Sequence, residues 1–336
     1  MRILLHVPLA RGSTRGNWIT ALRWEEIFTR MGHTVCTVDP AEFQSAAPGA
    51  YNLLIALHAR RSADAITKFR SAAPQAKIIV ALTGTDLHID FKRGTHGFDK
   101  VNGSIEAADR IVLLEPQGLK KLLPQVHSKC SVIYQSSVLP TLQKKPRDSA
   151  FKISLLAHLR EVKDPFLICR AATLLKKTST ASIYHAGEAT TPSWKHRAVQ
   201  WTQKSPRYQW LGPIPHRDAL QLLANSQLTV LTSHQEGAPS VFSEAAALGV
   251  PILSTRIPAS VGILGSTHPG LFDVHDAPRL ANLIERAETD QGFYRELGDA
   301  SLGLADCLSL DAESKAWKKL LAIWQPGQRG PGQSPG

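Results

Sequence analysis

The most informative part of the sequence is HQEGAPSVFSEAAALGVP, residues 234–251. It follows a short apolar run at 228–232 that is typical of a buried strand, and its second half has the composition of a helix. Pro239 suits the first helical turn, where its missing N–H would have no partner, and Gly249 with Pro251 ends the helix. The stretch therefore predicts a strand, a loop and a helix in succession, the unit from which parallel α/β sheets are built.

The start of this helix is a candidate phosphate site. The backbone N–H groups of Ser240 and Val241 lack helical partners, and the positive end of the helix dipole favours an anion. Glu236 lies in the preceding loop and Glu244 a little over one turn into the helix, so two carboxylates bracket the site. A carboxylate can accept hydrogen bonds from a pair of sugar hydroxyls. Two glutamates at this spacing also occur on solvated helix surfaces, and here the surrounding loop and helix ends favour a ligand.

Similar strands recur on either side of this stretch, with helical patterns between them, and such alternation predicts α/β architecture with parallel sheets. The segment 140–149 is polar, rich in lysine and punctuated by proline, and it separates two series of strands. A chain of 336 residues exceeds what one core usually serves, so we expect two Rossmann-like domains facing across a cleft. The expected strands are 3–7, 35–38, 53–57, 78–82 and 111–114, then 153–157, 182–185, 208–211, 228–232 and 252–254.

We expect four segments along the chain. Residues 1–145 form the first domain, and residues 146–311 form the second, which holds the candidate phosphate site. A final helix, residues 312–325, is expected to cross back onto the first domain because it carries an apolar face. The tail, residues 326–336, has nothing to bury and is expected to be disordered. The apolar face consists of Ala316, Trp317, Leu320, Leu321 and Trp324.

The charge and the cysteines narrow the class of protein. Lysine and arginine outnumber aspartate and glutamate by 39 to 28, and residues 1–150 hold 20 basic against 12 acidic side chains. This excess favours nucleic acid, an anionic membrane surface or a small acidic substrate, although a generally basic solvated surface is an equal alternative. No apolar run approaches the roughly 20 residues of a transmembrane helix, and the four cysteines are widely spaced. We expect a cytoplasmic protein with no structural zinc and no stable membrane association, and its oligomeric state stays open.

Two cations follow the first strand of the second domain, in LLAHLREVKDP at 155–165. Arg160 and Lys163 are expected at the same edge of the sheet as the helix start, because loops at the carboxyl ends of parallel strands meet there. A guanidinium fork and an ammonium group suit phosphate oxygens, whereas a pair of surface cations is the alternative. No Asp-x-Asp pair, a signature of metal–diphosphate binding, occurs, and the histidines are scattered along the chain. The sequence therefore predicts neither a metal nor another cofactor.

Three loops of the first domain are candidates for holding an anion. The first runs RGSTRGN, residues 11–17, and it lacks the GxGxxG pattern and ribose-binding acid of dinucleotide oxidoreductases. Gly16 would let the backbone approach a ligand closely, and a merely flexible connection is the alternative. The other two loops follow the third and fourth strands, where α/β proteins place ligands. The candidates are Arg11, Arg15, Asn17, His58, Arg60, Arg61, Thr83, Gly84, Thr85 and Asp86.

The pattern from Glu236 through Glu244 to the Gly-Val-Pro at 249–251 resembles the donor-nucleotide motif of the retaining glycosyltransferases with the GT-B fold. The resemblance implies that Glu244 holds the nucleotide ribose and that Glu236, with its neighbours, contacts the transferred sugar. It also implies that Arg160 and Lys163 neutralise the leaving diphosphate, so these two and Glu236 are the catalytic candidates. The implied donor-binding residues are Glu236, Gly237, Ala238, Pro239, Ser240, Val241, Glu244, Arg160, Lys163 and Gly16.

The acceptor side departs from this family in one respect. The segment Gly84-Thr85-Asp86 resembles the family's Gly-Thr-Asp, but Thr83 stands where many members have histidine. An acceptor-activating histidine is therefore not assigned at that position. His58 is either a charge partner or simply an oriented residue at a strand end.

Five phrases resemble one narrow subfamily, the selenosugar synthases of selenoneine biosynthesis. The resemblance implies transfer of N-acetylglucosamine from UDP-N-acetylglucosamine to selenophosphate, with a new carbon–selenium bond, UDP as leaving group and phosphate lost from selenium. A small trianionic acceptor would account for the basic first domain. The alternatives are a GT-B transferase with another nucleotide sugar and a hydroxyl acceptor, and a basic nucleic-acid-binding protein, for which no recognition motif is found. The phrases are RGSTRGNWITALRW at 11–24, LHARRS at 57–62, ALTGTDL at 81–87, HLREVKDP at 158–165 and STRIP at 254–258.

Overall fold

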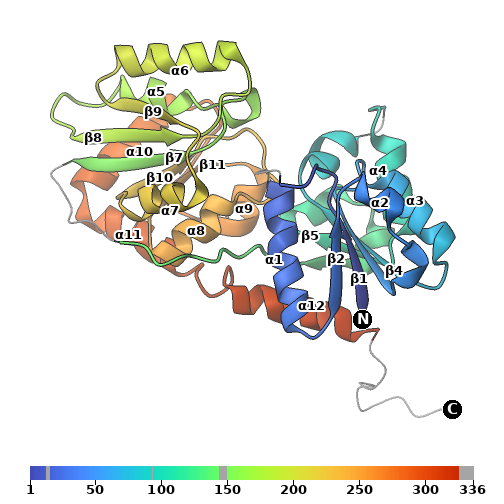
Figure 1. Ribbon diagram of the computed structural model, residues 1–336. Coiled ribbons are helices and arrows are strands. Elements are labelled where there is room, and N and C mark those ends of the chain that lie inside the picture. The colour runs from blue at the N-terminus through green and yellow to red at the C-terminus, as the bar shows by residue number, and fades with distance from the viewer. Residues whose placement is uncertain (13–15, 93, 144–149, 325–336) are drawn as a thin grey trace. The chain divides into compact units, whose positions relative to one another are not determined.

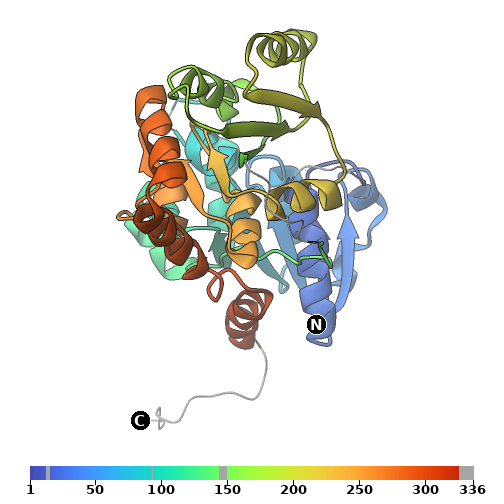
Figure 2. The same cartoon turned by 90° about the vertical axis from the view of Figure 1, so that its left-hand side faces the viewer.

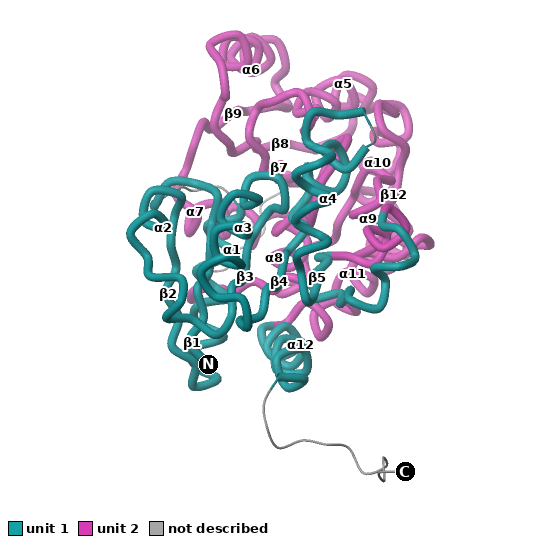
Figure 3. Tube along the Cα trace, turned by 90° about the vertical axis from the view of Figure 1, so that its right-hand side faces the viewer, with its two compact units in different colours: residues 1–114, 122–134, 310–336 teal, residues 115–121, 135–309 magenta. Residues whose placement is uncertain are grey.

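The computed structural model describes residues 1–12, 16–92, 94–143 and 150–324, and the chain divides into two compact units. Unit 1 comprises residues 1–114, 122–134 and 310–336, and unit 2 comprises residues 115–121 and 135–309 (Figure 3). Unit 2 therefore begins before residue 146, the start expected from the composition of the linker. Part of that linker, 144–149, and the tail from 325 onward lie outside the described residues.

Unit 1 contains a parallel six-stranded sheet in the order β2-β1-β3-β4-β5-β6 (Figure 1). Its third strand, Leu53–Leu57, is buried along its whole length, as expected for a parallel sheet covered on both faces. Because β1 lies between β2 and β3, the loops that follow β1 and β3 flank the point where the strand order reverses. The strands are β1 (Arg2–His6), β2 (Thr34–Val38), β3 (Leu53–Leu57), β4 (Lys77–Leu82), β5 (Arg110–Leu113) and β6 (Cys130–Val132).

The helices of unit 1 follow the strands in alternation, as the sequence predicts. They are α1 (Gly16–Arg30), α2 (Glu42–Ser45), α3 (Ala63–Ala72), α4 (Phe98–Ala107) and the C-terminal α12 (Leu310–Ala322), with short helical turns at Pro48–Ala50, Asp86–Asp90 and Pro124–Lys129.

Unit 2 contains a second parallel sheet of six strands, in the order β12-β11-β10-β7-β8-β9. Numbered from its own first strand, β7, this is the order 3-2-1-4-5-6 of Rossmann domains, whose ligands bind where the order reverses. That point lies between β7 and β10, and the loops that follow these two strands carry the candidate donor residues. The strands are β7 (Phe151–Leu156), β8 (Ala181–Ala186), β9 (Tyr208–Gly212), β10 (Leu228–Leu231), β11 (Ile252–Thr255) and β12 (Leu271–Phe272).

Helices cover the sheet of unit 2 and complete its core. α5 packs against α10, and α10 lies beside α11 (Figure 2, orange to red). Buried aliphatic side chains of β7, β10 and β11, among them Ile153, Leu228 and Leu253, meet those of the helices in one cluster. The helices are α5 (Leu167–Ala172), α6 (Pro192–Lys204), α7 (His216–Ala224), α8 (Ser240–Leu248), α9 (Pro258–Leu264), α10 (Ala277–Thr289) and α11 (Gln291–Leu302), with short turns at Pro116–Lys121 and Glu161–Lys163.

The C-terminal helix α12 belongs to unit 1, where it packs on α1 (Figure 1). Trp317 is fully buried and lies edge-on to Trp24 at 4.7 Å and to Phe28 at 4.9 Å between ring centroids. The Glu313 carboxylate, also buried, accepts hydrogen bonds from Trp24 Nε1 at 2.7 Å and from Arg23 Nε at 2.8 Å. The apolar face of α12 thus packs against α1, although the two helices lie near opposite ends of the sequence.

Some elements differ from the sequence prediction. The strands β6 and β12 were not predicted, because three and two residues are too few to show a pattern. The last helix begins at Leu310 rather than 312. Within the described residues, no helix combines the length and the apolar character that a membrane span needs.

Candidate functional site

The helix α8 begins with free backbone donors, as predicted. Pro239 stands before it in extended conformation, with φ −69° and ψ 120°, and no side chain in the described part of the chain caps the helix start. The N–H groups of Ser240 and Val241 are therefore available to an anion. At the other end Gly249 adopts the left-handed conformation, φ +65°, which favours glycine, and the helix stops there.

The loop between β10 and α8 is tied to the turn that follows β7. The Thr232 hydroxyl donates to the backbone oxygen of Lys163 at 2.8 Å, and the His234 N–H donates to the backbone oxygen of Val162 at 2.8 Å. A third bond, from the Thr255 hydroxyl to the backbone oxygen of Ser233 at 2.6 Å, joins β11 to the same loop. These bonds bring the two predicted donor segments together at one edge of the unit 2 sheet.

Two of the predicted catalytic residues, Lys163 and Glu236, contact each other directly. The Lys163 ammonium group forms an ion pair with Glu236 Oε1, which also accepts a hydrogen bond from the Ser233 hydroxyl at 2.5 Å. The two side chains are only 16% and 11% exposed, so the pair is well shielded from water. An anion that binds here can replace Glu236 as the partner of the lysine, and the glutamate then becomes an acceptor for hydroxyl groups.

Glu244 is buried in the first half of α8, and it has a partner that the sequence did not predict. Its Oε1 accepts a hydrogen bond from Nε2 of His216, the first residue of α7, at 3.0 Å. This bond raises the pKa of His216 above its usual value, because the carboxylate favours the charged imidazole. A histidine at the start of a helix gives no sequence signal of such a contact, since it depends on how α7 and α8 pack.

Arg160 lies in the same turn as Lys163 but differs from it in environment. It is exposed and stands just before the short turn Glu161–Lys163 in extended conformation. Within the described residues its guanidinium makes no hydrogen bond or ion pair. It is therefore available to an incoming phosphate group. Of the implied donor residues, Gly237 and Ala238 lie half-buried in the loop before α8, and Gly16 is the first residue of α1 in unit 1.

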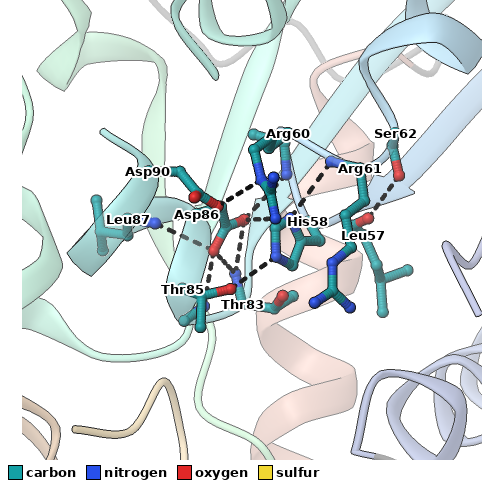
Figure 4. Close-up of polar contacts among 12 residues, drawn as sticks. Leu57, His58, Arg60, Arg61, Ser62, Thr83, Thr85, Asp86, Leu87 and Asp90 are labelled. Atoms are coloured by element: carbon teal, nitrogen blue, oxygen red, sulfur yellow. Dashed lines mark hydrogen bonds and ion pairs between the residues drawn. The ribbon is translucent and has the colours of Figure 1, made fainter. Parts of the chain in front are cut away.

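In unit 1, Asp86 organises the loop that follows β4 (Figure 4). The carboxylate is fully buried and accepts hydrogen bonds from the N–H groups of Gly84 at 2.8 Å, Ala59 at 2.9 Å and Leu87 at 3.1 Å. It accepts another from the N–H of Thr83. The carboxylate thus joins the loops that follow β3 and β4, and its two oxygens are occupied by backbone donors.

His58 adjoins this network at the end of β3 (Figure 4). Its Nε2 lies 2.8 Å from the Thr85 hydroxyl, and Nδ1 accepts from the Arg61 N–H at 3.5 Å, so the hydrogen is assigned to Nε2. Burial lowers the pKa of His58 and leaves the imidazole neutral at pH 7. Its backbone is left-handed, φ +67°, which is rare for histidine. Its Nδ1 also lies 3.8 Å from Asp86 Oδ2, so the geometry is compatible with both alternatives, a charge partner and an oriented strand-end residue.

The arginines predicted to hold the acceptor fall into two groups. Arg11 is engaged by Glu42, at 2.6 and 2.8 Å, and Arg60 is engaged by Asp90 at 2.8 Å. Arg61 is exposed, and no dashed line reaches its guanidinium in Figure 4. Within the described residues it has no carboxylate partner, so it is the arginine best placed to meet an anion from solvent.

For the remaining acceptor candidates, the structure gives their place in the fold and their exposure. Asn17 is half-buried in the first turn of α1, and Thr85 is exposed at the end of the β4 loop. Arg15 lies outside the described residues. Sequence patterns alone do not indicate that Arg11 pairs with Glu42 and Arg60 with Asp90, because each carboxylate lies about 30 residues further along the chain.

The sequence of unit 2 matches a known family. Residues 142–302 match the family model described as Glycosyl transferases group 1. A curated protein of Bacillus subtilis (strain 168), provisionally named the teichuronic acid biosynthesis glycosyltransferase TuaC, is 33% identical over 88 residues. That alignment covers 26% of this chain and 23% of TuaC, so the chain spans under a quarter of the length of the curated relative it matches.

Solved structures resemble the chain over almost all its length. Anabaena Alr3699/HepE in complex with UDP and glucose has a TM-score of 0.77 at 14% identity, covering 96% of this chain and 100% of that one. A glycosyltransferase from Rickettsia africae ESF-5 has a TM-score of 0.75 at 14% identity, covering 97% and 99%. At this identity the likeness establishes the fold. Residues 142–302 thus match the family model of group 1 glycosyl transferases, and the chain has the GT-B fold.

Proposed function

We propose that the protein transfers a sugar from a nucleoside diphosphate sugar, with the donor bound by unit 2. The observation that carries this proposal is the grouping of three features at one sheet edge: the uncapped start of α8, the Lys163–Glu236 pair and the buried Glu244. Backbone N–H groups and a lysine suit a diphosphate, and a buried carboxylate suits ribose hydroxyls. The family match of residues 142–302 supports the same assignment.

In this proposal Arg160 and Lys163 act on the leaving group. Negative charge accumulates on the diphosphate as the bond to the sugar breaks, and preorganised cations stabilise that charge. Lys163 is held in position by Glu236, so it is oriented before the donor arrives. Arg160 has no partner among the described residues and supplies a charge that Glu236 does not neutralise. The transfer then needs no divalent cation.

We assign UDP-N-acetylglucosamine as donor and selenophosphate as acceptor, on the resemblance to selenosugar synthases. The selenium attacks the anomeric carbon, the bond from that carbon to the UDP oxygen breaks, and UDP leaves with the electron pair. Water then cleaves the phosphorus–selenium bond, which releases phosphate and the selenosugar. Selenium is strongly nucleophilic, so the buried neutral His58 and the threonine at 83 are compatible with a reaction without a dedicated general base.

The acceptor is assigned to the loops of unit 1, where Arg61 is the exposed arginine without a carboxylate partner in the described chain. Arg61→Ala should raise the KM for selenophosphate and reduce its dependence on salt, because an electrostatic attraction is lost. Arg60→Ala is the matched control, since Asp90 already neutralises that charge. Equal KM values for the wild type and Arg61→Ala would contradict the assignment.

A second candidate is a transferase with a hydroxyl acceptor, and the match to TuaC, a protein named for teichuronic acid biosynthesis, favours it. Mass spectrometry of products separates the two. The purified protein is incubated with UDP-N-acetylglucosamine, UDP-glucose and UDP-galactose, each with selenophosphate, thiophosphate or a panel of sugar alcohols. Our proposal predicts N-acetylglucosamine bearing selenium only with the first donor and selenophosphate. Products formed only with hydroxyl acceptors would replace it by the second candidate, and no product from any pair would refute both.

A further inference from the structure

Three metal-ligating side chains of unit 2 converge outside the proposed donor contacts. Asp164 follows the turn after β7, His234 lies in the loop after β10, and His275 follows β12. Asp164 Oδ2 lies 3.4 Å from His234 Nε2 and 3.3 Å from His275 Nδ1. The two imidazole rings are 4.4 Å apart between centroids, and the three ligand atoms all lie within 4.8 Å of one another. The histidines that are scattered in the sequence are thus brought to one carboxylate by the fold.

The ligand types and spacing suit a zinc ion. Two imidazoles and one carboxylate, with a fourth position for water, form a frequent zinc ligand set. Ligand atoms at zinc–nitrogen and zinc–oxygen bond lengths around a tetrahedral ion lie about 3.3–3.4 Å apart, and both distances from Asp164 Oδ2 have this value. The His275 side chain is 66% exposed, so a small rotation can shorten its distance to His234. Magnesium and calcium prefer oxygen ligands and fit this set poorly.

A second observation concerns His234. Its Nε2 atom is buried, and it has no hydrogen-bond partner within the described part of the chain. A buried polar atom without a partner is unfavourable, and a metal ion bound at Nε2 would remove that penalty. The atom is directed at the Asp164 carboxylate rather than at solvent.

The backbone at the other two ligands is also unusual. Asp164 has φ +35° and His275 has φ +67°, and among the described residues only one other non-glycine residue, His58, has positive φ. Glycine adopts this conformation without strain, so side chains at these two positions carry a steric cost. Arg170 donates to both Asp164 oxygens, at 2.9 and 3.1 Å, and fixes the orientation of the carboxylate. Such an outer partner is typical of metal-binding carboxylates.

We propose that Asp164, His234 and His275 bind one Zn²⁺ ion, with water completing the coordination. The ion would join the loops that follow three strands of the unit 2 sheet. Asp164 adjoins Lys163 in the chain, and His234 lies two residues before Glu236, so the ion would stiffen both donor segments. It is not placed among the reacting groups, and the zinc site stands whether or not the protein transfers a sugar.

The test is a zinc titration of untagged, chelator-stripped protein in competition with a chromogenic chelator. We expect one Zn²⁺ per chain. Asp164→Asn and His275→Asn should each raise the Kd for zinc by about tenfold or more, the scale on which metal sites respond to lost partners. Asparagine tolerates the left-handed backbone of both positions, so these variants should fold. The control is His196→Asn, since His196 is exposed on α6 with Gln200 as its partner.

A spectroscopic and a thermal readout accompany the titration. Co²⁺ bound in place of zinc should give the intense visible absorption of a four-coordinate ion in the wild type and His196→Asn, and lose it in the two ligand variants. At one fixed zinc concentration, zinc should raise Tm less in the two ligand variants than in the wild type and His196→Asn, because stabilisation by a ligand falls as its Kd rises. The proposal is overturned if the wild type binds less than one zinc per chain, or if Asp164→Asn and His275→Asn bind zinc as tightly as the wild type.

Discussion

The ribose assignment of Glu244 leads to a quantitative prediction. Its carboxylate is buried, and Oε1 already accepts from His216 Nε2 at 3.0 Å, so the other oxygen is left for a hydroxyl group. A hydrogen bond to a charged group contributes about 1.5–3 kcal/mol. Glu244→Ala should therefore weaken UDP binding by about one to two decades in Kd. Glu244→Gln keeps an acceptor oxygen without the charge, so it should raise the Kd for UDP by about tenfold, the lower end of that range.

Isothermal titration calorimetry with UDP measures both Kd values, and thermal unfolding checks the fold. His216 is 58% exposed, so water can replace Glu244 as its partner and the variants should remain folded. Glu296→Ala, which removes an exposed carboxylate of α11, is the matched control and should bind UDP as the wild type does. Folded Glu244→Ala protein that binds UDP within twofold of the wild type would refute the ribose assignment.

Three further predictions concern turnover, pH and stability. Arg160→Ala and Lys163→Ala should each lower kcat by about 10²–10³, with Tm little changed for Arg160→Ala because Arg160 is exposed, since each removes a preorganised charge from the leaving group; near-normal kcat in steady-state assays would contradict this. The hydrogen bond to Glu244 raises the pKa of His216 in the folded state. The bond therefore stabilises the folded protein fully below the pKa that His216 has in the unfolded chain, and this stabilisation is lost as pH rises through the pKa of the folded state. His216→Ala should consequently lower Tm more at pH 6 than at pH 9, and an equal loss at both would count against the bond. Trp317→Ala should destabilise unit 1 by about 3–5 kcal/mol in urea unfolding, because a fully buried indole is removed from between α12 and α1; a loss under 1 kcal/mol, on the scale of a surface substitution, would show that the helix is not docked.

Much of the fold could be predicted from the sequence because its elements carry strong local signals. The buried strand Leu53–Leu57 is wholly apolar, and α8 is bounded by a proline and a left-handed glycine. The apolar face of the C-terminal helix, at the chain end after the second domain has completed its own series, predicts packing on the first domain, and Trp317 lies buried against α1. The sequence does not predict β6 and β12, because these short strands form through pairing with β5 and β11 rather than through their own composition.

The sequence predicts which loops form the candidate site, but it does not predict which charged side chains pair with one another there. The helix start at Ser240 and the turn at Lys163 follow from strand order, which brings these loops to one sheet edge. Whether a charged side chain is free or paired depends on residues far away in sequence. Arg60 meets Asp90, and Glu244 meets His216, and no local pattern marks either contact.

The central claim is that unit 2 holds the donor nucleotide at the start of α8. A crystal structure of the protein with UDP tests it most directly. We predict that the diphosphate lies within hydrogen-bond distance of the N–H groups of Ser240 and Val241 and of the Lys163 ammonium, with the ribose on Glu244. UDP bound away from the start of α8, with the Lys163–Glu236 pair undisturbed and Glu244 still engaged only by His216, would contradict the account.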